Sequence, residues 1–325
     1  GLGDVYKRQG HDTMNTVPIV FAFDNNLILP ACVCISSLMM HAREDTFYDI
    51  FILHAQKEQL ERAELDRIPG FYPNCRIRYR SVGDTFDGAF EIRGITTPAY
   101  YRLLIPELIP EYDKVIYSDV DVIFRTDLSG FYSGTDLTNC YVAGVNALSH
   151  AVSEYKKYYE KTLELDPEKI IYSGNLILNN AKIRKDNLVP VWKELARRNF
   201  RFQDMDILNI ACRGKIRYLP PEFCLSTWIT QAAVHNRTTL SEQWSQEEID
   251  AALTRGTIHY NGHKPWRQYC INFDIWWEYY RRSPFFDAGF YFDFFYHRLN
   301  ILDQLTLWKR IKVLLRYFVY GKRVL

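Results

Sequence analysis

Residues 115–124 read VIYSDVDVIF, in which two short hydrophobic runs flank the polar segment Ser118-Asp119-Val120-Asp121. Each run is typical of a buried β-strand. The two carboxylates between them need a reason, because a charge buried without a partner costs several kcal/mol. In an extended segment, residues two apart point to the same side, so Asp119 and Asp121 can converge on one cation. The stretch therefore predicts a metal site at the end of a buried strand.

The triplet D-x-D alone does not decide the matter. Such triplets occur by chance, and a second one, Asp204-Met205-Asp206, lies further along the chain. The position of the first triplet between two buried runs favours metal binding, because ligands of open parallel sheets lie at the carboxyl ends of the strands.

The rest of the chain alternates strand and helix patterns. Apolar runs at 18–23, 47–53 and 75–82 predict strands, and the segments at 29–41 and 57–67 predict helices between them. Further strands are predicted at 141–147, 169–180, 216–220 and 256–262, and further helices at 99–108, 189–200 and 204–212. The βαβαβ order indicates an α/β fold with a mostly parallel sheet flanked by helices.

Three segments differ in character. Residues 1–13 are unlike the apolar stretch that begins after Met14, so we predict a non-native or disordered leader there. Residues 14–270 are predicted to form one doubly wound domain, because no repeat or low-complexity linker divides them. Residues 271–325 are rich in aromatic and basic side chains and are predicted to form a helical extension.

Composition excludes several classes of protein. Of the 325 residues, 47% are hydrophobic and 24% charged, and 40 basic against 39 acidic residues leave a net charge of +1. A net charge this close to zero gives no overall positive potential that would attract nucleic acid, so no nucleic-acid partner is expected. Seven cysteines without C-x-x-C spacing indicate reduced core thiols in a cytoplasmic protein. No apolar run reaches the length of about 18 residues that a spanning helix needs.

Two other polar groups belong to the predicted site. Asp24 and Asn26 come after the first strand, where they either cap the next helix or recognise a base or ribose. The stretch HYNGHKPW, residues 259–266, supplies a histidine, a glycine and a lysine. Lysine acts as a point charge on phosphate, and two carboxylates with one imidazole suit Mn²⁺ better than Ca²⁺. A structural role for the histidine is the alternative.

The segments 24–26, 119–121, 203–209 (QDMDILN) and 259–266 occur in an order and spacing that resemble the family 8 retaining glycosyltransferases. The resemblance spans about residues 17–285, and the chain is similar to bacterial lipopolysaccharide galactosyl- and glucosyltransferases. It implies a GT-A fold, a UDP-sugar donor, a saccharide or lipid-linked saccharide acceptor, and a Mn²⁺ cofactor with Mg²⁺ as the alternative.

The resemblance also implies roles for individual residues. The metal ligands would be Asp119, Asp121 and His259. The donor-binding residues would be Asp24, Asn26, Arg102, Asp119, Val120, Asp121, Asp204, Gly262 and Lys264.

Different residues of this set would contact different parts of the donor. Asp24 and Asn26 would contact uracil and ribose, and Gly262 and Lys264 would contact the diphosphate. The catalytic residues would be Asp204 and Arg102, which hold the donor sugar.

The sequence departs from the family pattern at four points. Leu27 stands where some members place a tyrosine against uracil, and Tyr172 replaces the asparagine of N-[AS]-G. HYNGHKPW is one residue shorter than H-x-x-G-x-x-K-P-W. Met205 fills the glutamine position of D-Q-D. Because a thioether is no glycosyl nucleophile, retention is expected to proceed by attack of the acceptor on the face from which UDP departs.

The C-terminal residues 308–319 carry an amphipathic helical pattern. Apolar side chains share one face and Lys309, Lys312 and Arg316 share another. This pattern is typical of helices that lie on an anionic membrane surface, here the inner face of the cytoplasmic membrane. The alternative is a helix packed on the sheet. The aromatic run from Phe273 to Tyr296 is predicted to fix the extension to the main domain, with stacking on acceptor sugars as the alternative.

These patterns support three candidate functions. The first is a metal-dependent hexosyltransferase that moves glucose or galactose from a UDP-sugar to a saccharide, lipopolysaccharide or glycolipid acceptor. The second is a degenerate sugar-nucleotide-binding protein, since Tyr172 and Met205 alter the sugar pocket. The third is a metal-dependent nucleotidyltransferase, which the absence of a glycine-rich phosphate loop after the first strand disfavours.

Overall fold

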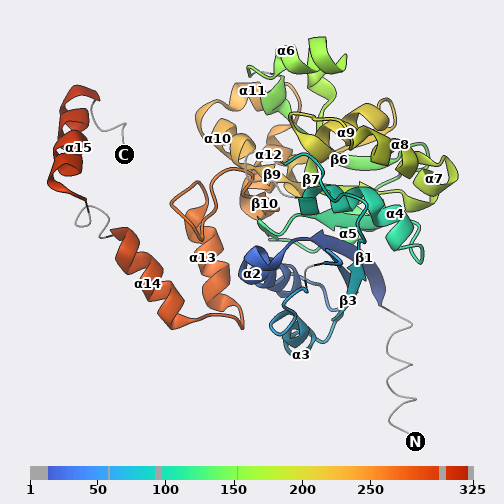
Figure 1. Ribbon diagram of the computed structural model, residues 1–325, viewed down its shortest axis with the longest axis horizontal. Helices are drawn as coiled ribbons and strands as arrows, with labels where there is room; N and C mark the ends of the chain where they lie inside the picture. Colours follow the sequence, from blue (N-terminus) through green and yellow to red (C-terminus); the bar gives the residue numbers. More distant parts are fainter. Residues whose placement is uncertain (1–13, 58, 92–96, 152, 300–304, 321–325) are drawn as a thin grey trace, which may run out of the picture.

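The computed structural model describes residues 14–57, 59–91, 97–151, 153–299 and 305–320. The predicted leader at 1–13 therefore lies outside the described residues. At the centre is a seven-stranded sheet in the order β3-β2-β1-β4-β7-β6-β8 (Figure 1). Its strands are β1 (Asn15–Ala22), β2 (Thr46–His54), β3 (Cys75–Ser81), β4 (Val115–Ser118), β6 (Val142–Asn146), β7 (Ile171–Leu178) and β8 (Ile216–Leu219).

The sheet is mostly parallel, as predicted. Only β7 runs against its neighbours β4 and β6, while the other pairs that the structure describes in this sheet are parallel. A second sheet of three short strands was not predicted. It has the order β5-β10-β9 and consists of β5 (Val122–Ile123), β9 (Leu225–Ser226) and β10 (Ile258–His259).

Helices cover both faces of the large sheet, so the chain forms a three-layered α/β structure. One face carries α2 (Ile28–Met40), α3 (Ile68–Phe71), α10 (Thr227–His235), α11 (Arg237–Ser241), α12 (Gln246–Arg255) and α13 (Phe273–Arg282). The other face carries the 3-10 helix η3 (Thr97–Leu104), α4 (Ile105–Leu108), α7 (Asn180–Lys185), α8 (Leu188–Leu195) and α9 (Gln203–Ala211). The remaining α-helices are α5 (Ser129–Gly134), α6 (Lys156–Tyr158), α14 (Ala288–Leu299) and α15 (Leu307–Tyr320).

Burial on both faces explains the sequence of the central strands. Six of the eight residues of β1 and eight of the nine residues of β2 are buried, so these strands are continuous apolar runs rather than alternating ones. Helix α2 shares the hydrophobic core of one face with these strands. Its Ser37 Oγ accepts a hydrogen bond of 2.9 Å from the backbone N–H of Phe124, which fixes the chain directly after β5.

Three predicted elements differ in the structure. Segment 57–67 is not a helix in its described part, because its buried residues Leu60 and Leu65 are not spaced for one helical face, and only a 3-10 turn, η2 (Leu65–Arg67), forms before α3. Segment 99–108 begins as the 3-10 helix η3 and becomes α-helical only at Ile105. The strand predicted at 256–262 shortens to the two residues of β10.

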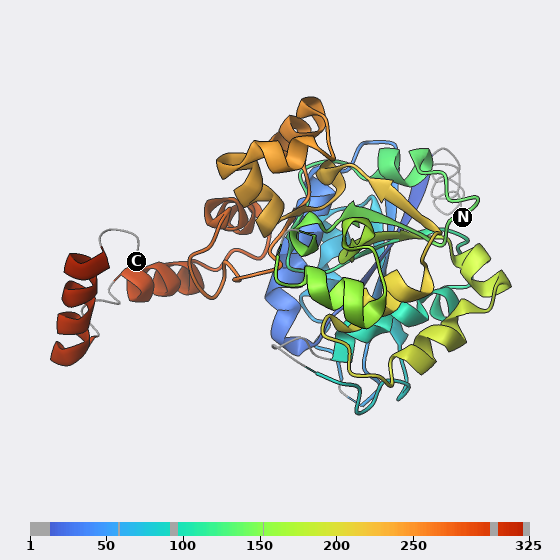
Figure 2. The same cartoon turned by 90° about the horizontal axis from the view of Figure 1, so that it is seen from above.

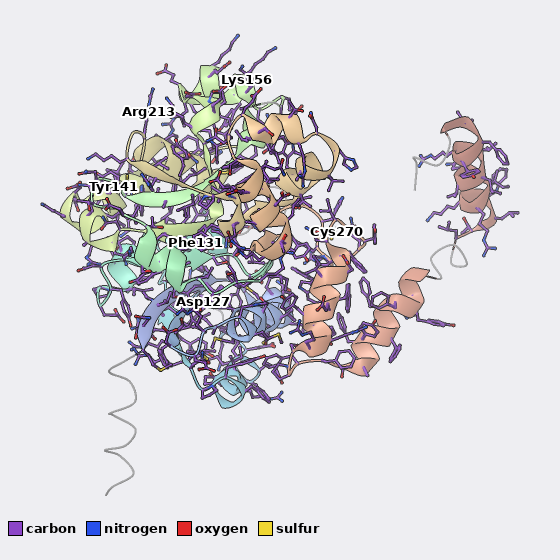
Figure 3. The ribbon with its side chains drawn as sticks, turned by 180° about the vertical axis from the view of Figure 1, so that it is seen from behind. Asp127, Phe131, Tyr141, Lys156, Arg213 and Cys270 are labelled. Atoms are coloured by element: carbon purple, nitrogen blue, oxygen red, sulfur yellow. The ribbon has the colours of Figure 1, made fainter. Side chains whose placement is uncertain are left out.

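The C-terminal extension is helical, and its first helix packs on the main body. Trp276 and Tyr280 of α13 are fully buried, and the Tyr279 hydroxyl lies 2.6 Å from His41 Nε2 at the end of α2. The aromatic residues of α13 thus fix the extension to the body, as predicted. In contrast, Figures 1 and 2 both show α15 apart from the body, and the same separation is visible from behind in Figure 3.

A buried ion pair joins the edge strand β3 to β2. The carboxylate of Asp49 is fully buried and accepts hydrogen bonds of 2.7 Å from Arg76 Nε, Arg76 Nη2 and the Tyr112 hydroxyl, with Arg78 Nε at 3.1 Å. Asp49 and Arg76 are direct partners in the strand register. All three partners approach one carboxylate, so its charge is compensated without water.

We expect Asp49→Asn to lower the free energy of unfolding by about 1–3 kcal/mol, because charge-assisted bonds at a buried position are lost. Urea unfolding followed by circular dichroism measures this change. The control is Asp113→Asn, since the Asp113 side chain is 83% exposed in its pair with Arg184 and should contribute little. Equal urea midpoints for the two variants would show that the Asp49 pair does not stabilise the sheet.

Candidate active site

The candidate site lies at the carboxyl ends of the neighbouring strands β1 and β4. The chain leaves β4 at Ser118 and enters β5 at Val122, so the D-x-D triplet forms the connection between the two sheets. The connection bends at Val120 and Asp121 rather than remaining extended. Strand β10 pairs antiparallel with β5, with His259 opposite Val122. The small second sheet therefore brings the histidine to the aspartates.

Asp119, Asp121 and His259 converge as predicted. One ligand atom from each residue lies within 4.8 Å of the others, and His259 Nε2 is 3.3 Å from Asp121 Oδ1 and 3.6 Å from Asp119 Oδ2. The histidine side chain is 6% exposed, whereas the two carboxylates are 26% and 16% exposed and face the opening. This set of two oxygen donors and one nitrogen donor fits a divalent cation such as Mn²⁺ or Mg²⁺.

A glycine on β7 makes room for this cluster. A Cβ atom placed on Gly174 would lie 2.2 Å from His259 Cε1 and 2.8 Å from Asp119 Oδ2. The Gly174 carbonyl also accepts a hydrogen bond of 2.7 Å from the Asp119 N–H. Gly174 was not among the predicted site residues. The tripeptide Tyr172-Ser173-Gly174 holds the only local signal, which is a residue without a side chain inside a buried strand.

Arg102 connects the cluster to Asp204. Its Nη2 lies 2.8 Å from Asp119 Oδ1 and its Nε lies 3.2 Å from Asp204 Oδ2. The second contact is an ion pair without hydrogen-bond geometry, because Nε donates to the Ala99 carbonyl at 2.8 Å. Burial raises the pKa of Asp204 to about 6, although the Arg102 charge acts in the opposite direction. The two predicted catalytic residues are thus adjacent and buried.

Lys264 occupies the other side of the cluster. Its ammonium group donates hydrogen bonds to Asp121 Oδ2 and to the Tyr260 carbonyl. Burial opposes the ionisation of Asp121, but Lys264 and His259 outweigh burial and hold the pKa of that carboxyl well below its usual range. Gly262 is exposed, and its nearest neighbour at the Cβ position is Thr227 Oγ1 at 4.0 Å. The structure therefore brings Lys264, but not Gly262, into contact with the cluster.

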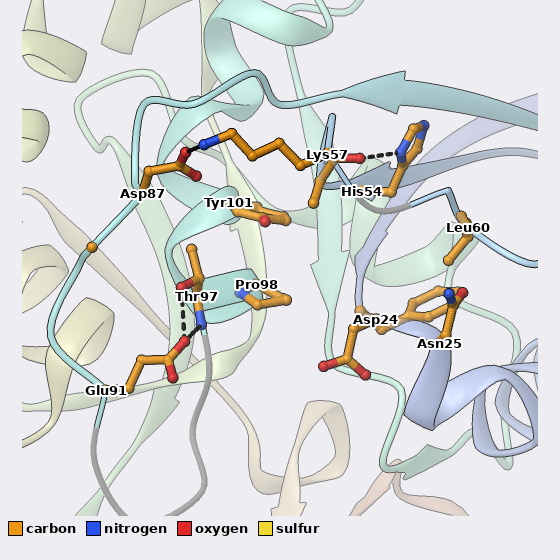
Figure 4. Close-up of a pocket in the computed structure, with 13 residues that line it drawn as sticks. Asp24, Asn25, His54, Lys57, Leu60, Asp87, Glu91, Thr97, Pro98 and Tyr101 are labelled. Atoms are coloured by element: carbon orange, nitrogen blue, oxygen red, sulfur yellow. Dashed lines mark hydrogen bonds and ion pairs between the residues drawn. The ribbon is translucent and has the colours of Figure 1, made fainter.

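A cavity of about 610 Å³ lies at the carboxyl end of β1 (Figure 4), and none of the cluster residues is among those that line it. Helix η3 links the two, because Pro98 and Tyr101 line the cavity while the next residue, Arg102, contacts Asp119. Other lining residues are Phe23, Asp24, Asn25, His54, Ala55, Lys57, Leu60, Asp87, Gly88, Glu91 and Thr97. No pattern in the sequence indicated His54 or the ion pair between Lys57 and Asp87 at this cavity.

Of the three polar residues that follow β1, Asp24 and Asn25 line the cavity and Asn26 does not. Asp24 lines the cavity and also caps the 3-10 helix η1 (Asn25–Leu27), accepting a hydrogen bond of 3.0 Å from the Asn26 N–H. The cavity is lined by Asn25 and not by Asn26, which is exposed. Leu27 packs against the hydrophobic core instead of the cavity. Leu60, Pro98 and Tyr101 contribute to the apolar part of the cavity lining.

Two departures from the family pattern are buried inside the protein. The Tyr172 hydroxyl lies 3.0 Å from Ser149 Oγ and accepts a hydrogen bond of 3.2 Å from Ser226 Oγ. Met205 is 8% exposed and belongs to the hydrophobic core. Tyr172 thus joins β7 to the start of α10, and Met205 presents no reactive group to the site.

The sequence model of glycosyl transferase family 8 matches residues 18–270, more than three quarters of the chain. The chain belongs to this family. Curated relatives include a Haemophilus influenzae protein, 24% identical over 64% of this chain, and General stress protein A of Bacillus subtilis, 26% identical over 56% of it. The chain covers 63% of the length of either protein, which is less than two thirds.

Solved glycosyltransferase structures share the fold. The galactosyltransferase LgtC, solved in complex with donor and acceptor sugar analogues, is 24% identical, with a TM-score of 0.67 and coverage of 84% of this chain and 98% of that one. The bifunctional glycosyltransferase WbbM is 23% identical, with a TM-score of 0.67 and coverage of 87% of this chain and 52% of that one. The α/β architecture is therefore the GT-A fold.

We expect Gly174→Ala to weaken Mn²⁺ binding by about 10-fold or more, because the added methyl displaces His259 or Asp119. Isothermal titration calorimetry measures the affinity, and thermal unfolding reports whether the fold persists. Gly130→Ala is the matched control, since no atom lies within 4 Å of its Cβ position in α5. If both variants bind Mn²⁺ as the wild type does, Gly174 is not part of the metal site.

Proposed function

We propose that this glycosyltransferase is a retaining enzyme that moves glucose or galactose from a UDP-sugar to a saccharide or lipid-linked saccharide acceptor. One observation carries the proposal: Asp119, Asp121 and His259 meet beside Lys264 at the carboxyl end of β4, the strand next to β1, after which Asp24 lines a cavity. Negative ligands for a cation and a flexible ammonium group suit the diphosphate of a nucleotide, and a cavity with apolar and polar lining suits its base and ribose.

The metal site would be formed by Asp119, Asp121 and His259, with Val120 between the carboxylates. A Mn²⁺ ion bound there would supply positive charge against the pyrophosphate of the departing UDP, and Mg²⁺ is the alternative. The Lys264 side chain is 27% exposed and its ammonium group contacts Asp121, so this group would also contact the diphosphate of a donor held at the metal site. Gly262 would allow the backbone of this loop to approach the phosphates.

The base and ribose would occupy the cavity, with Asp24 as the polar contact and Asn25 in the place predicted for Asn26. The donor sugar would lie against Arg102 and Asp204. Arg102 would orient hydroxyl groups of the sugar while it keeps Asp119 in place, and Asp204 would accept hydrogen bonds from them.

The route to retention depends on the side chain at position 205. Met205 lies in the hydrophobic core and carries no nucleophile, so a glycosyl-enzyme intermediate at this residue is disfavoured. The acceptor hydroxyl would instead approach the face from which UDP leaves. Lys264 and Arg102 would stabilise the charge that develops on the leaving group.

The acceptor side would include a membrane surface. Apolar side chains of α15 are open to solvent, with Trp308 74% and Phe318 79% exposed, so the alternative of a helix packed on the sheet is not realised. Basic residues of the same helix are also exposed. None of the helices that the structure describes is long and apolar enough to span a bilayer. We propose a cytoplasmic enzyme whose extension at 271–325 attaches to an anionic leaflet.

We expect Asp119→Ala and Asp121→Ala each to lower Mn²⁺-dependent UDP release from UDP-glucose or UDP-galactose by several orders of magnitude while the fold persists. Asp136→Ala, an exposed aspartate outside the site, is the control. Full activity of either site variant would overturn the metal assignment. In the wild type, pyrophosphate release from UTP and sugar phosphate would indicate a nucleotidyltransferase, and donor binding without turnover a degenerate protein.

We expect deletion of residues 300–325 to abolish sedimentation with vesicles of phosphatidylcholine containing phosphatidylserine, because exposed apolar and basic side chains are lost together. Activity on a soluble acceptor should persist. Pure phosphatidylcholine vesicles and the Lys309→Gln/Lys312→Gln variant separate the electrostatic from the apolar contribution. Sedimentation of the truncated protein with anionic vesicles would show that α15 is not the attachment helix.

A further inference from the structure

We propose that Cys224 is a positioning residue for His259: its thiol accepts the Nδ1–H hydrogen bond and thereby keeps Nε2 facing Asp119 and Asp121. This inference rests on the proposed metal site and assigns a role to a residue outside the predicted set. It concerns how the imidazole is held, because a histidine binds a cation only through a nitrogen that carries no proton.

The geometry places the thiol on the side of the ring opposite to the carboxylates. Cys224 Sγ lies 3.7 Å from His259 Nδ1, within the distance for a hydrogen bond to sulfur, whereas Nε2 is the atom close to Asp119 and Asp121. The thiol is therefore no ligand of the cluster. Cys224 is fully buried and His259 is 5% exposed, so water does not compete for Nδ1.

The backbone fixes both partners. Cys224 directly precedes β9, which pairs in parallel with β10, with Leu225 opposite Ile258 and Ser226 opposite His259. On the β7 side, the ring edge fills the space that a side chain at Gly174 would occupy. The imidazole is thus enclosed by a backbone without a side chain on one side and by a thiol on another. A ring flip would exchange its nitrogen and carbon atoms and break both sets of contacts.

The chemistry of sulfur suits this position. A neutral imidazole has one N–H, and when the proton resides on Nδ1 the Nε2 lone pair is free to face a cation. A carboxylate is the usual acceptor for such an N–H, but it would add a third negative charge beside Asp119 and Asp121. A buried neutral thiol accepts the hydrogen bond without that charge. Cys224 therefore orients His259 while it leaves the charge of the cluster unchanged.

The test compares Cys224→Ala and Cys224→Ser with Cys212→Ala, because Cys212 is an equally buried thiol at the end of α9. Mn²⁺ affinity is measured by electron paramagnetic resonance. The His259 tautomer is read from ¹⁵N shifts of histidine-labelled protein with Mg²⁺ as the diamagnetic ion, assigned with His259→Ala. We expect about 10-fold weaker Mn²⁺ binding for Cys224→Ala. Loss of the single Nδ1–H tautomer should accompany it, with partial recovery in Cys224→Ser and no change in Cys212→Ala.

The outcomes separate this inference from the proposed function. If the wild type binds no Mn²⁺, the metal site itself is wrong. If the wild type binds Mn²⁺ and Cys224→Ala matches it in affinity and in ¹⁵N shifts, the role of Cys224 is refuted. Equal weakening in Cys212→Ala would also refute it, because general loss of packing would then account for the effect. Thermal unfolding of each variant shows whether the fold persists. If Cys224→Ala does not fold, Cys224→Ser takes its place in the comparison of Mn²⁺ affinity and ¹⁵N shifts.

Discussion

The structure depends on holding two like charges together where a buried strand ends. Asp119 and Asp121 would repel each other across the short connection between β4 and β5 if no cation were near. Arg102 contacts the first carboxylate, Lys264 contacts the second, and His259 lies beside both. In the proposed reaction, Asp119 and Asp121 would hold a divalent cation that compensates their charge, which would leave the Lys264 ammonium group available to a phosphate.

The surrounding fold is arranged to keep this cluster in place. The β4–β5 connection is held by the hydrogen bond from the Asp119 N–H to the Gly174 carbonyl of β7, and Ser37 of α2 holds the chain directly after β5. The two-residue strand β10 adds His259, and its pairing with β5 is short because the chain must turn at once into the loop that carries Lys264. The residues with chemistry therefore lie in connections, while the long strands supply rigidity.

The local pattern of apolar and charged residues was sufficient to predict the large sheet and the position of the two carboxylates at the end of a strand. Charge that interrupts an apolar run is a local signal, and it pointed to Asp119 and Asp121, which the structure brings together with His259. The sequence did not indicate Gly174 or Cys224, because their contacts with His259 join residues more than thirty positions apart in the chain. Strands β9 and β10 are also too short to show a strand pattern in the sequence. Asn25 lines the cavity and Asn26, the residue predicted to contact the donor, does not, and both lie in the 3-10 turn that follows Asp24.

The two D-x-D triplets show why spacing alone could not identify the site. Asp204 and Asp206 lie in helix α9, where residues two apart diverge by about 200° around the axis. Asp204 accordingly faces Arg102, whereas Asp206 accepts hydrogen bonds of 2.7 Å and 3.1 Å from the hydroxyls of Tyr158 and Tyr159 in the interior. Asp119 and Asp121 lie outside any helix and reach the same imidazole nitrogen. Backbone conformation thus brings the two carboxylates of one triplet together at His259, and it divides the other triplet between Arg102 and the core.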